Sequence, residues 1–433
     1  KAQVSGQSCG QAPLTMRDSA EVTVEFMREL LHRARSPSAG PAFGPVTLTG
    51  ISKIWSSALQ RRHALAAALA ALASPTLLRA QEPQRRRIVL AQSAPLTGPA
   101  AQLGLQMQAG AKLFFDGVNA AGGVGGLPIE LKTLDDGYEP ERCKANTEKF
   151  IEEDVFALFG YVGTPTSLAA LPLVNQHKIP FFAPFTGAEA LREPASRWVF
   201  HLRASYFDET ALIVKQLTQL GLNKISVFHQ NDSYGRAGLE GVQRALKALS
   251  LAPQAVSTVE RNSQDVAKAV KELVPGKPEA IVMVSAYKSC AAFIREARRA
   301  GYGGVFYNVS FVGTQALSDE LGKEALGVVV SQVMPYPFGA ATGVVADYQA
   351  ALQKAGGEWK PNYTSMEGYL AAKVITEGLR RMAKVSRDSL VAGLESMSNY
   401  NAGGFPLKFG PGKHVGSSFV ELSMLTGDGR VRR

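Results

Sequence analysis

The sequence predicts an α/β fold made of two doubly wound lobes, each with a parallel sheet. Apolar runs of strand length alternate with helix-period segments from about residue 88 to residue 332, and this alternation is typical of parallel sheets with helices on both faces. The strands are too numerous for one sheet, and 433 residues are too many for one ordinary core. Two lobes are therefore expected.

The stretch 88–139 predicts the first βαβ unit. An apolar run at 88–91 leads into a Pro-Leu-Thr-Gly-Pro turn, a helix-period segment covers 101–121 and ends in two glycines, and a second strand closes on Asp135 and Asp136. The turn lacks the glycine spacing of a dinucleotide loop, and Pro99 removes a backbone N–H that a pyrophosphate would need. The unit therefore predicts a right-handed crossover without a nucleotide site.

The rest of the chain continues the alternation. Further strands are expected at 155–160, 179–183, 199–202, 224–229, 254–259, 280–284, 305–308, 328–332, 405–409 and 418–425. Helices are expected at 141–152, 167–177, 208–220, 235–249, 265–273, 289–300, 344–355, 365–382 and 386–396. We expect the chain to cross into the second lobe near Ala204, and to return at 334–337, where two prolines interrupt regular structure.

Charge and cysteine content exclude several classes. Nine of the 47 Lys and Arg but only four of the 37 Asp and Glu lie in residues 1–80, and the later excess is spread thinly, so we expect no nucleic-acid binding. The cysteines are Cys9, Cys143 and Cys290, without a C-x-x-C pair or a cluster of metal-ligand spacing. We expect no metal, no cofactor and no structural disulfide.

The N-terminus looks like an export signal. Residues 1–60 are an unassigned extension, read as an over-extended start or a fragment rather than a domain. At 61–80 a basic start precedes an apolar run of about ten residues, which is too short to span a bilayer, and a small residue precedes Gln81. This pattern predicts a signal peptide for the general secretory or the twin-arginine route, and a soluble protein secreted to the periplasm.

Motifs in the first lobe carry a family resemblance. A strand, Thr97-Gly98-Pro99, a glycine, a long helix, Asn119-Ala120-Ala121-Gly122-Gly123 and a strand ending in two aspartates follow one another in order. This string resembles the opening of the periplasmic leucine/isoleucine/valine-binding protein family, the receptors of branched-chain amino-acid ABC transporters. The resemblance runs from about residue 87 to residue 430.

The resemblance implies the type I periplasmic binding fold, a ligand cleft and an inner-membrane partner. It places 86–204 plus 336–413 in the first lobe and 205–335 plus 414–430 in the second, joined by a hinge of three crossings. It implies a monomeric solute-binding protein that closes on a small carboxylate-bearing solute, an amino acid or an aromatic or short-chain carboxylic acid, and delivers it to the permease of an ABC importer. A periplasmic sensing subunit with the same fold is the alternative, which gene neighbourhood would separate. An α/β enzyme would need a cofactor loop or a nucleophile elbow, and neither motif is visible.

Candidate ligand contacts in the first lobe lie in loops that follow strands, where open parallel sheets bind ligands. Thr164 opens a helix, either as a plain cap or as the family's carboxylate-binding hydroxyl. Thr186 is similar to a family threonine that holds the same headgroup, and Phe185 beside it either narrows the pocket or stacks on a ring. Leu103 stands where the amino-acid receptors have an aromatic cover, and it is either that cover or core.

In the second lobe, Tyr234 and Tyr287 match ligand-facing tyrosines of the family, while Asp232 is expected to cap a helix. Ser310 stands where the amino-acid receptors carry a glutamate for the ligand ammonium. Because a buried ammonium without an anionic partner is costly, either another acid supplies the charge or the ligand lacks an ammonium group. Glu367 is the candidate acid, unless it is simply solvated at a helix start.

Overall fold

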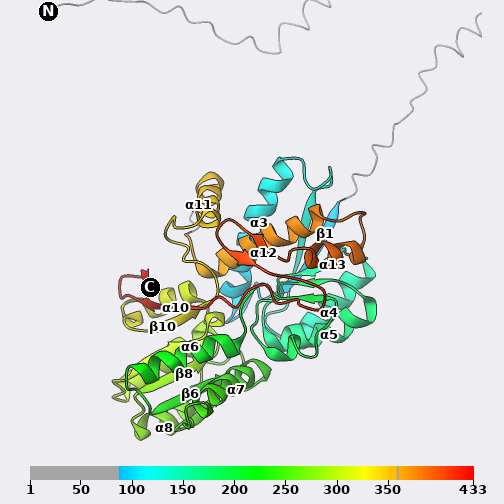
Figure 1. Cartoon of the computed structure of the whole chain (residues 1–433). Coiled ribbons are helices and arrows are strands. Elements are labelled where there is room, and N and C mark those ends of the chain that lie inside the picture. Colours follow the sequence, from blue (N-terminus) through cyan, green and yellow to red (C-terminus); the bar gives the residue numbers. More distant parts are fainter. Residues whose placement is uncertain (1–86, 358–359) are drawn as a thin grey trace, which may run out of the picture. The chain divides into compact units, whose positions relative to one another are not determined.

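The computed structural model describes residues 87–357 and 360–433, which contain two parallel sheets with helices packed on them (Figure 1). The expected extension at 1–60, the signal peptide at 61–80 and Cys9 lie outside the described residues. Strands β6 (Ile225–Gln230) and β8 (Ala280–Val284) are buried along their whole length. The continuous apolar run of β8 is what a strand in the middle of a covered parallel sheet requires, while β6 also buries Ser226, His229 and Gln230.

The first sheet has the strand order β2-β1-β3-β4-β5, with every pair parallel. Its strands are β1 (Ile88–Ala94), β2 (Ile129–Asp135), β3 (Ala157–Phe159), β4 (Phe181–Phe182) and β5 (Val199–Phe200). Its helices are α3 (Ala101–Ala120), α4 (Pro140–Glu152), α5 (Thr164–His177), α11 (Gly343–Ala355), α12 (Tyr363–Arg380) and α13 (Arg387–Glu395). The first strand lies inside the sheet, which creates the change of direction where doubly wound folds bind ligands.

The second sheet repeats this arrangement and adds two strands, in the order β14-β13-β10-β9-β8-β6-β7. The strands not yet given are β7 (Val256–Val259), β9 (Val305–Asn308), β10 (Val329–Gln332), β13 (Glu421–Leu425) and β14 (Val431–Arg432), and only β13 and β14 pair antiparallel. The helices are α6 (Tyr206–Gln219), α7 (Ser233–Lys247), α8 (Ala267–Leu273), α9 (Tyr287–Arg299) and α10 (Thr314–Leu321). A short pair, β11 (Tyr400–Asn401) with β12 (Pro406–Leu407), precedes β13.

Three connections join the two sheets. The first runs from β5 to α6, the second from β10 to α11, and the third from β12 to β13, the last visible in Figure 1 as the dark red chain that leads to the C-terminus. The first and third lie side by side, because His201 N donates to His414 O (2.8 Å) and Gly416 N donates to His201 O (2.8 Å).

The two aspartates that end β2 fix the turns around them. The carboxylate of Asp135 accepts from Leu96 N (2.7 Å) and from Thr97 Oγ1 (2.7 Å), and Asp136 accepts from Ser93 Oγ (2.7 Å) and Tyr138 N (2.8 Å). Although burial raises the pKa of Asp135, these hydrogen bonds hold it well below its ordinary value. The aspartates therefore shape the loops at the carboxyl edge of the first sheet.

Two glycines set the close packing of α3 on α12. A methyl group at Gly110 would lie 1.8 Å from Ser365 O, and one at Gly368 would lie 2.1 Å from Met107 O. Only a residue without Cβ lets the two backbones approach this closely. The contact carries α12, which comes late in the chain, back onto the first lobe.

The expected fold class is confirmed, with local differences. Helix α7 begins at Ser233 rather than at 235, because Asp232 caps it by accepting from Tyr234 N (2.9 Å), as expected for this aspartate. Helix α10 and strand β14 were not expected, since both are short. Cys143 in α4 and Cys290 in α9 are buried and unpaired, in different lobes.

Candidate ligand-binding site

The loops at the carboxyl edges of the two sheets face each other. Tyr138, from the first lobe, accepts a hydrogen bond from Gln230 Nε2 of the second lobe (3.2 Å). A methyl group on Gly313 would lie 2.4 Å from Leu103 Cδ2, so α3 also closely approaches the start of α10. The candidate site is therefore a region between the lobes.

A pair of threonine hydroxyls lies on the first-lobe side. Thr164 Oγ1 and Thr186 Oγ1 are 2.6 Å apart, and Thr186 Oγ1 also accepts from Ala188 N (3.2 Å). Helix α5 begins at Thr164 after Gly163, whose φ is 106°, so Thr164 is the first helical residue and not the cap residue. Both hydroxyls are buried beside the start of a helix, a place that favours a negatively charged group.

Aromatic rings fill the space between the lobes around Phe311. Its ring centroid lies 4.5 Å from that of Tyr234, 5.4 Å from that of Phe185 and 5.9 Å from that of Tyr138. Tyr234 is fully buried, and its hydroxyl has no hydrogen-bond partner in the described part of the chain. These rings make the walls of the site apolar, with a polar group left unpaired at one point.

A buried arginine lies at the centre of the site. Arg203 Nε and Nη2 donate to the two oxygens of Glu367, each at 2.9 Å, and its guanidinium carbon lies 4.2 Å from the centre of the Phe185 ring. Both side chains of the ion pair are almost completely buried, with exposed fractions of 1% and 2%. Arg203 Nη1 has no partner among the described residues.

A second buried acid lies behind Ser310. Glu209 accepts from Ser310 N (2.7 Å), Ser310 Oγ (3.0 Å) and Ser331 Oγ (2.5 Å). Burial raises the pKa of Glu209, and the Arg203 charge and these hydrogen bonds oppose the rise. Burial likewise raises the pKa of Glu367, against the charge of Arg203.

These groups enclose a small void between the lobes. Its volume is about 10 Å³, and its walls include Phe185, Arg203, Ser310, Gln332 and Glu367. A space of this size holds about one water molecule, so a ligand must separate the lobes further than they are here. The two lobes are therefore tightly closed on each other in this structure.

All eight sequence-predicted residues are buried at or near this region, and the structure brings three of them, Phe185, Ser310 and Glu367, to the void itself. Thr164 and Thr186 form the hydroxyl pair, Leu103 faces Gly313 of the opposite lobe, and Tyr234 packs on Phe311 of its own lobe. Tyr287 is also buried, as the first residue of α9.

One interpretation is wrong, and two charged residues were not predicted. Glu367 is not solvated at a helix start, because it is buried in α12 and paired with Arg203. Arg203 directly follows the strand expected at 199–202. A charged residue at the carboxyl end of a strand could have marked it as a candidate site residue. Glu209 lies in the first turn of the helix expected at 208–220, where an acidic residue is common, and nothing in its sequence neighbourhood marks it as a site residue.

No metal centre or membrane span emerges from the described residues. Across 87–357 and 360–433, His, Cys, Asp and Glu side chains form no group of three suited to a metal ion. In the same ranges, every helix falls short of the length and apolarity that a membrane crossing needs.

Two similar lobes, three connections and a buried polar site between them define a two-lobed solute-binding protein. The family model for periplasmic binding proteins matches residues 88–428, and the chain belongs to that family. Its relatives are solute-binding proteins and not enzymes.

Individual relatives agree with this assignment. The chain is 23% identical over 338 residues to Leu/Ile/Val-binding protein homolog 8 of Brucella abortus, a match that covers 73% of this chain and 82% of the relative. A crystal structure described as a possible leucine/isoleucine/valine-binding protein from Rhodopirellula baltica is similar with a TM-score of 0.77, 34% identity and coverage of 79% and 95% of the two chains. A substrate-binding periplasmic protein from Ralstonia solanacearum has a TM-score of 0.76, 30% identity and coverage of 80% and 99%.

Proposed function

We propose that this protein is a periplasmic solute-binding protein of an ABC importer, and that it closes on a small carboxylate-bearing solute. The observation that carries the proposal is Arg203 Nη1, a charged donor buried between the lobes without a partner in the described residues. A buried unpaired donor costs about 1–3 kcal/mol, which an acceptor from a ligand would recover. A carboxylate is the acceptor that a guanidinium binds best.

The threonine pair supports the same ligand class. Thr164 is the first residue of α5, and Thr186 lies in the loop that follows β4, so their paired hydroxyls lie beside a helix N-terminus, which favours an anion. Phe185 lies in the adjacent loop, stacked under Arg203. In this proposal Thr164, Thr186 and Arg203 bind the carboxylate, and Tyr234 and Tyr287 seal it from the second lobe.

The charges favour an amino acid over an acid that lacks an ammonium group. The site contains one cation, Arg203, and two acids, Glu209 and Glu367, of which Glu367 is already paired. Glu209 has no ion-pair partner in the described residues and accepts hydrogen bonds from Ser310 and Ser331, next to the position where the resemblance expected an acid. We assign the ligand ammonium to Glu209, so that the missing acid at Ser310 is supplied from α6.

The lobe limits follow the connections. We place 86–204 plus 336–413 in the first lobe and 205–335 plus 414–430 in the second. The boundary between 204 and 205 is supported by the capping box of Ser205 and Asp208, which starts α6. The assignment of the C-terminal segment to the second lobe is supported by the pairing of β13 with β10. In this proposal the signal peptide directs the protein to the periplasm, where it acts as a monomer and passes solute to the permease of the inner membrane.

Mass spectrometry of small molecules released from the purified, denatured protein tests the proposal. We expect a stoichiometric amino acid or other small carboxylic acid, and calorimetry with that compound should give one site per chain. Release of a neutral sugar, or turnover of the bound compound into a product, would contradict the proposal.

A further inference from the structure

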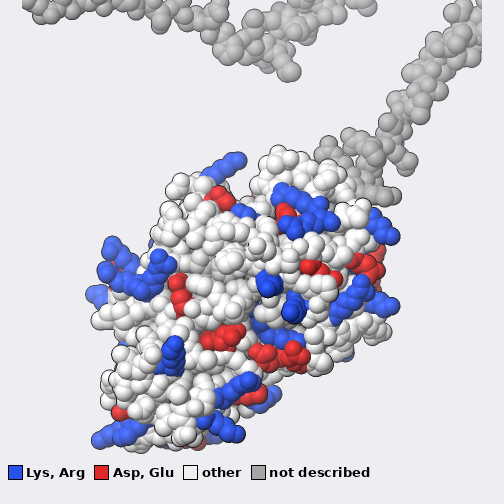
Figure 2. Space-filling model, in the orientation of Figure 1, with Lys and Arg blue, Asp and Glu red and all other residues white. Residues whose placement is uncertain are grey.

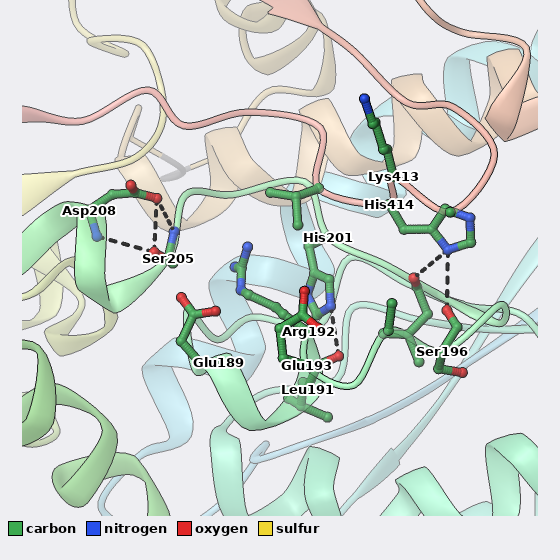
Figure 3. Close-up of a pocket in the computed structure, with 14 residues that line it drawn as sticks. Glu189, Leu191, Arg192, Glu193, Ser196, His201, Ser205, Asp208, Lys413 and His414 are labelled. Carbon is green, nitrogen blue, oxygen red and sulfur yellow. Dashed lines mark hydrogen bonds between the residues drawn. The ribbon is translucent and has the colours of Figure 1, made fainter.

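A second pocket lies outside the region between the lobes, against the hinge (Figure 3). Its volume is about 340 Å³, which is within the range of small-ligand sites. Its walls come from the loop 189–196, from the first connection at 201–208 and from the third connection at 412–415. Two of the three segments that join the lobes therefore line this pocket.

Arg192 is buried in the wall of this hinge pocket with donors unused. Its Nη2 donates to Arg203 O (3.1 Å) and Ala204 O (3.2 Å), at the start of the first connection. Its Nε and Nη1 have no partner among the described residues, although the residue is only 7% exposed. Burial lowers the pKa of Arg192 to about 10, against the charge of Glu189, so the guanidinium remains charged at neutral pH.

Acidic side chains line the same pocket. Glu189, Glu193 and Asp208 all contribute to its walls, yet Arg192 forms no ion pair within the described ranges. Figure 3 shows the Arg192 side chain near Glu189, with Asp208 bonded to Ser205 instead. Figure 2 likewise shows acidic and basic side chains adjoining on the middle of this face, without a broad area of one sign.

The two signs of charge restrict what the hinge pocket can bind. An anion alone would be attracted by Arg192 and Lys413 but would meet three carboxylates, and a cation alone would meet the two basic groups. A small molecule with both an anionic and a cationic end satisfies both sets. An α-amino acid in its zwitterionic form has this pattern at the required size.

We propose that the hinge pocket is a second site, which binds a small amino-acid zwitterion with its carboxylate on Arg192 and its ammonium group toward Glu189 and Glu193. This site is separate from the cleft of the proposed function. Because its walls include the start of α6 as well as the loop 189–196 of the first lobe, an occupant contacts both lobes at the hinge. Its binding is therefore coupled to the angle between the lobes, and hence to the affinity of the cleft.

Calorimetry with three probes on the full chain tests this site. The probes are glycine, acetate and methylammonium, each titrated to millimolar concentrations into the Thr164→Ala variant, whose cleft is weakened. We expect glycine to bind at least about tenfold more tightly than either half-probe. Adding Glu189→Gln and Glu193→Gln should weaken glycine binding by about tenfold and leave acetate binding unchanged or stronger.

Three results would overturn the inference. They are equal affinity for glycine and acetate, absence of heat from glycine at these concentrations, and glycine binding that the two glutamate substitutions do not change. Glycine bound by the unaltered chain but lost in Thr164→Ala would place it in the cleft, which refutes the hinge site and leaves the proposed function intact. Arg192→Gln should abolish both glycine and acetate binding, and if that variant does not fold, the glutamate variants still decide.

Discussion

Arg203 and Glu367 are 164 residues apart in the chain and form a two-point ion pair, with both N–O distances at 2.9 Å. Arg203 stands at the first connection between the lobes, and Glu367 lies in the first turns of α12. The pair holds the guanidinium against the Phe185 ring and leaves Nη1 directed away from Glu367. Glu367 therefore positions Arg203 and is not itself available to pair with a ligand ammonium.

Glu367→Gln should lower the free energy of unfolding by about 3–5 kcal/mol, because it leaves a buried arginine without its counter-charge. Urea unfolding measures the change. The double variant Arg203→Met with Glu367→Leu removes both charges and should cost clearly less than the sum of its single variants. A Glu367→Gln variant as stable as the unaltered protein would show that the ion pair does not stabilise the fold.

Glu209→Gln tests the charge that we assign to the ligand. With the amino acid identified by mass spectrometry and its analogue lacking the amino group, the unaltered protein should prefer the amino acid. The variant should lose about tenfold or more of that preference, because the anionic partner of the ammonium is removed while the carboxylate contacts remain. Calorimetry with both compounds measures it, and an unchanged preference would assign the ammonium elsewhere.

Much of the fold could be predicted from the sequence because it depends on local patterns. The strand-helix alternation and the cap at Asp232 each follow from residues close together in the chain. Helix α10 was missed because its eight residues lie between Gly313 and Gly322 and carry too little periodicity to distinguish a helix from a loop.

The charged part of the site could not be predicted in the same way. The partners of Arg203 and Glu209 are Glu367, Ser310 and Ser331, which lie from about 100 to more than 160 residues away. Local sequence contains no signal for such pairings, since each one joins segments that are far apart in the chain and meet only when their own lobe has folded. The threonine pair could be predicted because both members lie in the segments that lead from a strand end, where the fold class itself places ligands.

Asp136 should make stability depend on pH. Burial raises its pKa from 3.8 to about 6, despite hydrogen bonds from Ser93 and Tyr138. Between about pH 4 and pH 6 the folded protein keeps a proton that the unfolded chain has lost, so the free energy of unfolding falls as the pH rises, by about 3 kcal/mol in all. Asp136→Asn should remove this part of the slope, and urea unfolding at several pH values measures it. Parallel curves for the two proteins would contradict the prediction.

A polar latch should stabilise the closed lobes. Arg261 Nη2 donates to Glu139 Oε2 (2.8 Å), and Asn262 Nδ2 donates to Glu139 Oε1 (2.7 Å) and Gly137 O (3.1 Å). The pair is partly exposed, at 24% and 41%, so Glu139→Gln should weaken solute binding by only about 0.5–1 kcal/mol, and less at high salt. Glu141→Gln, at an exposed position in the first turn of α4, the helix that Glu139 precedes, is the matched control and should change nothing. Equal effects of the two variants on solute affinity would show that Glu139 does not stabilise the closed lobes.

Thr164→Ala should weaken binding of the natural solute by about 1–2 kcal/mol with little change in stability, because a hydroxyl that bonds a carboxylate is lost. Thr166→Ala is the matched control, since Thr166 lies in the same first turn of α5 but its Oγ1 donates to Val162 O (2.5 Å) inside the loop. Thr164→Ser keeps the hydroxyl and should keep most of the affinity. Calorimetry on the three variants measures the effect. If Thr164→Ala binds as tightly as the unaltered protein, or if Thr166→Ala loses as much affinity, the carboxylate does not lie on the hydroxyl pair at Thr164 and Thr186.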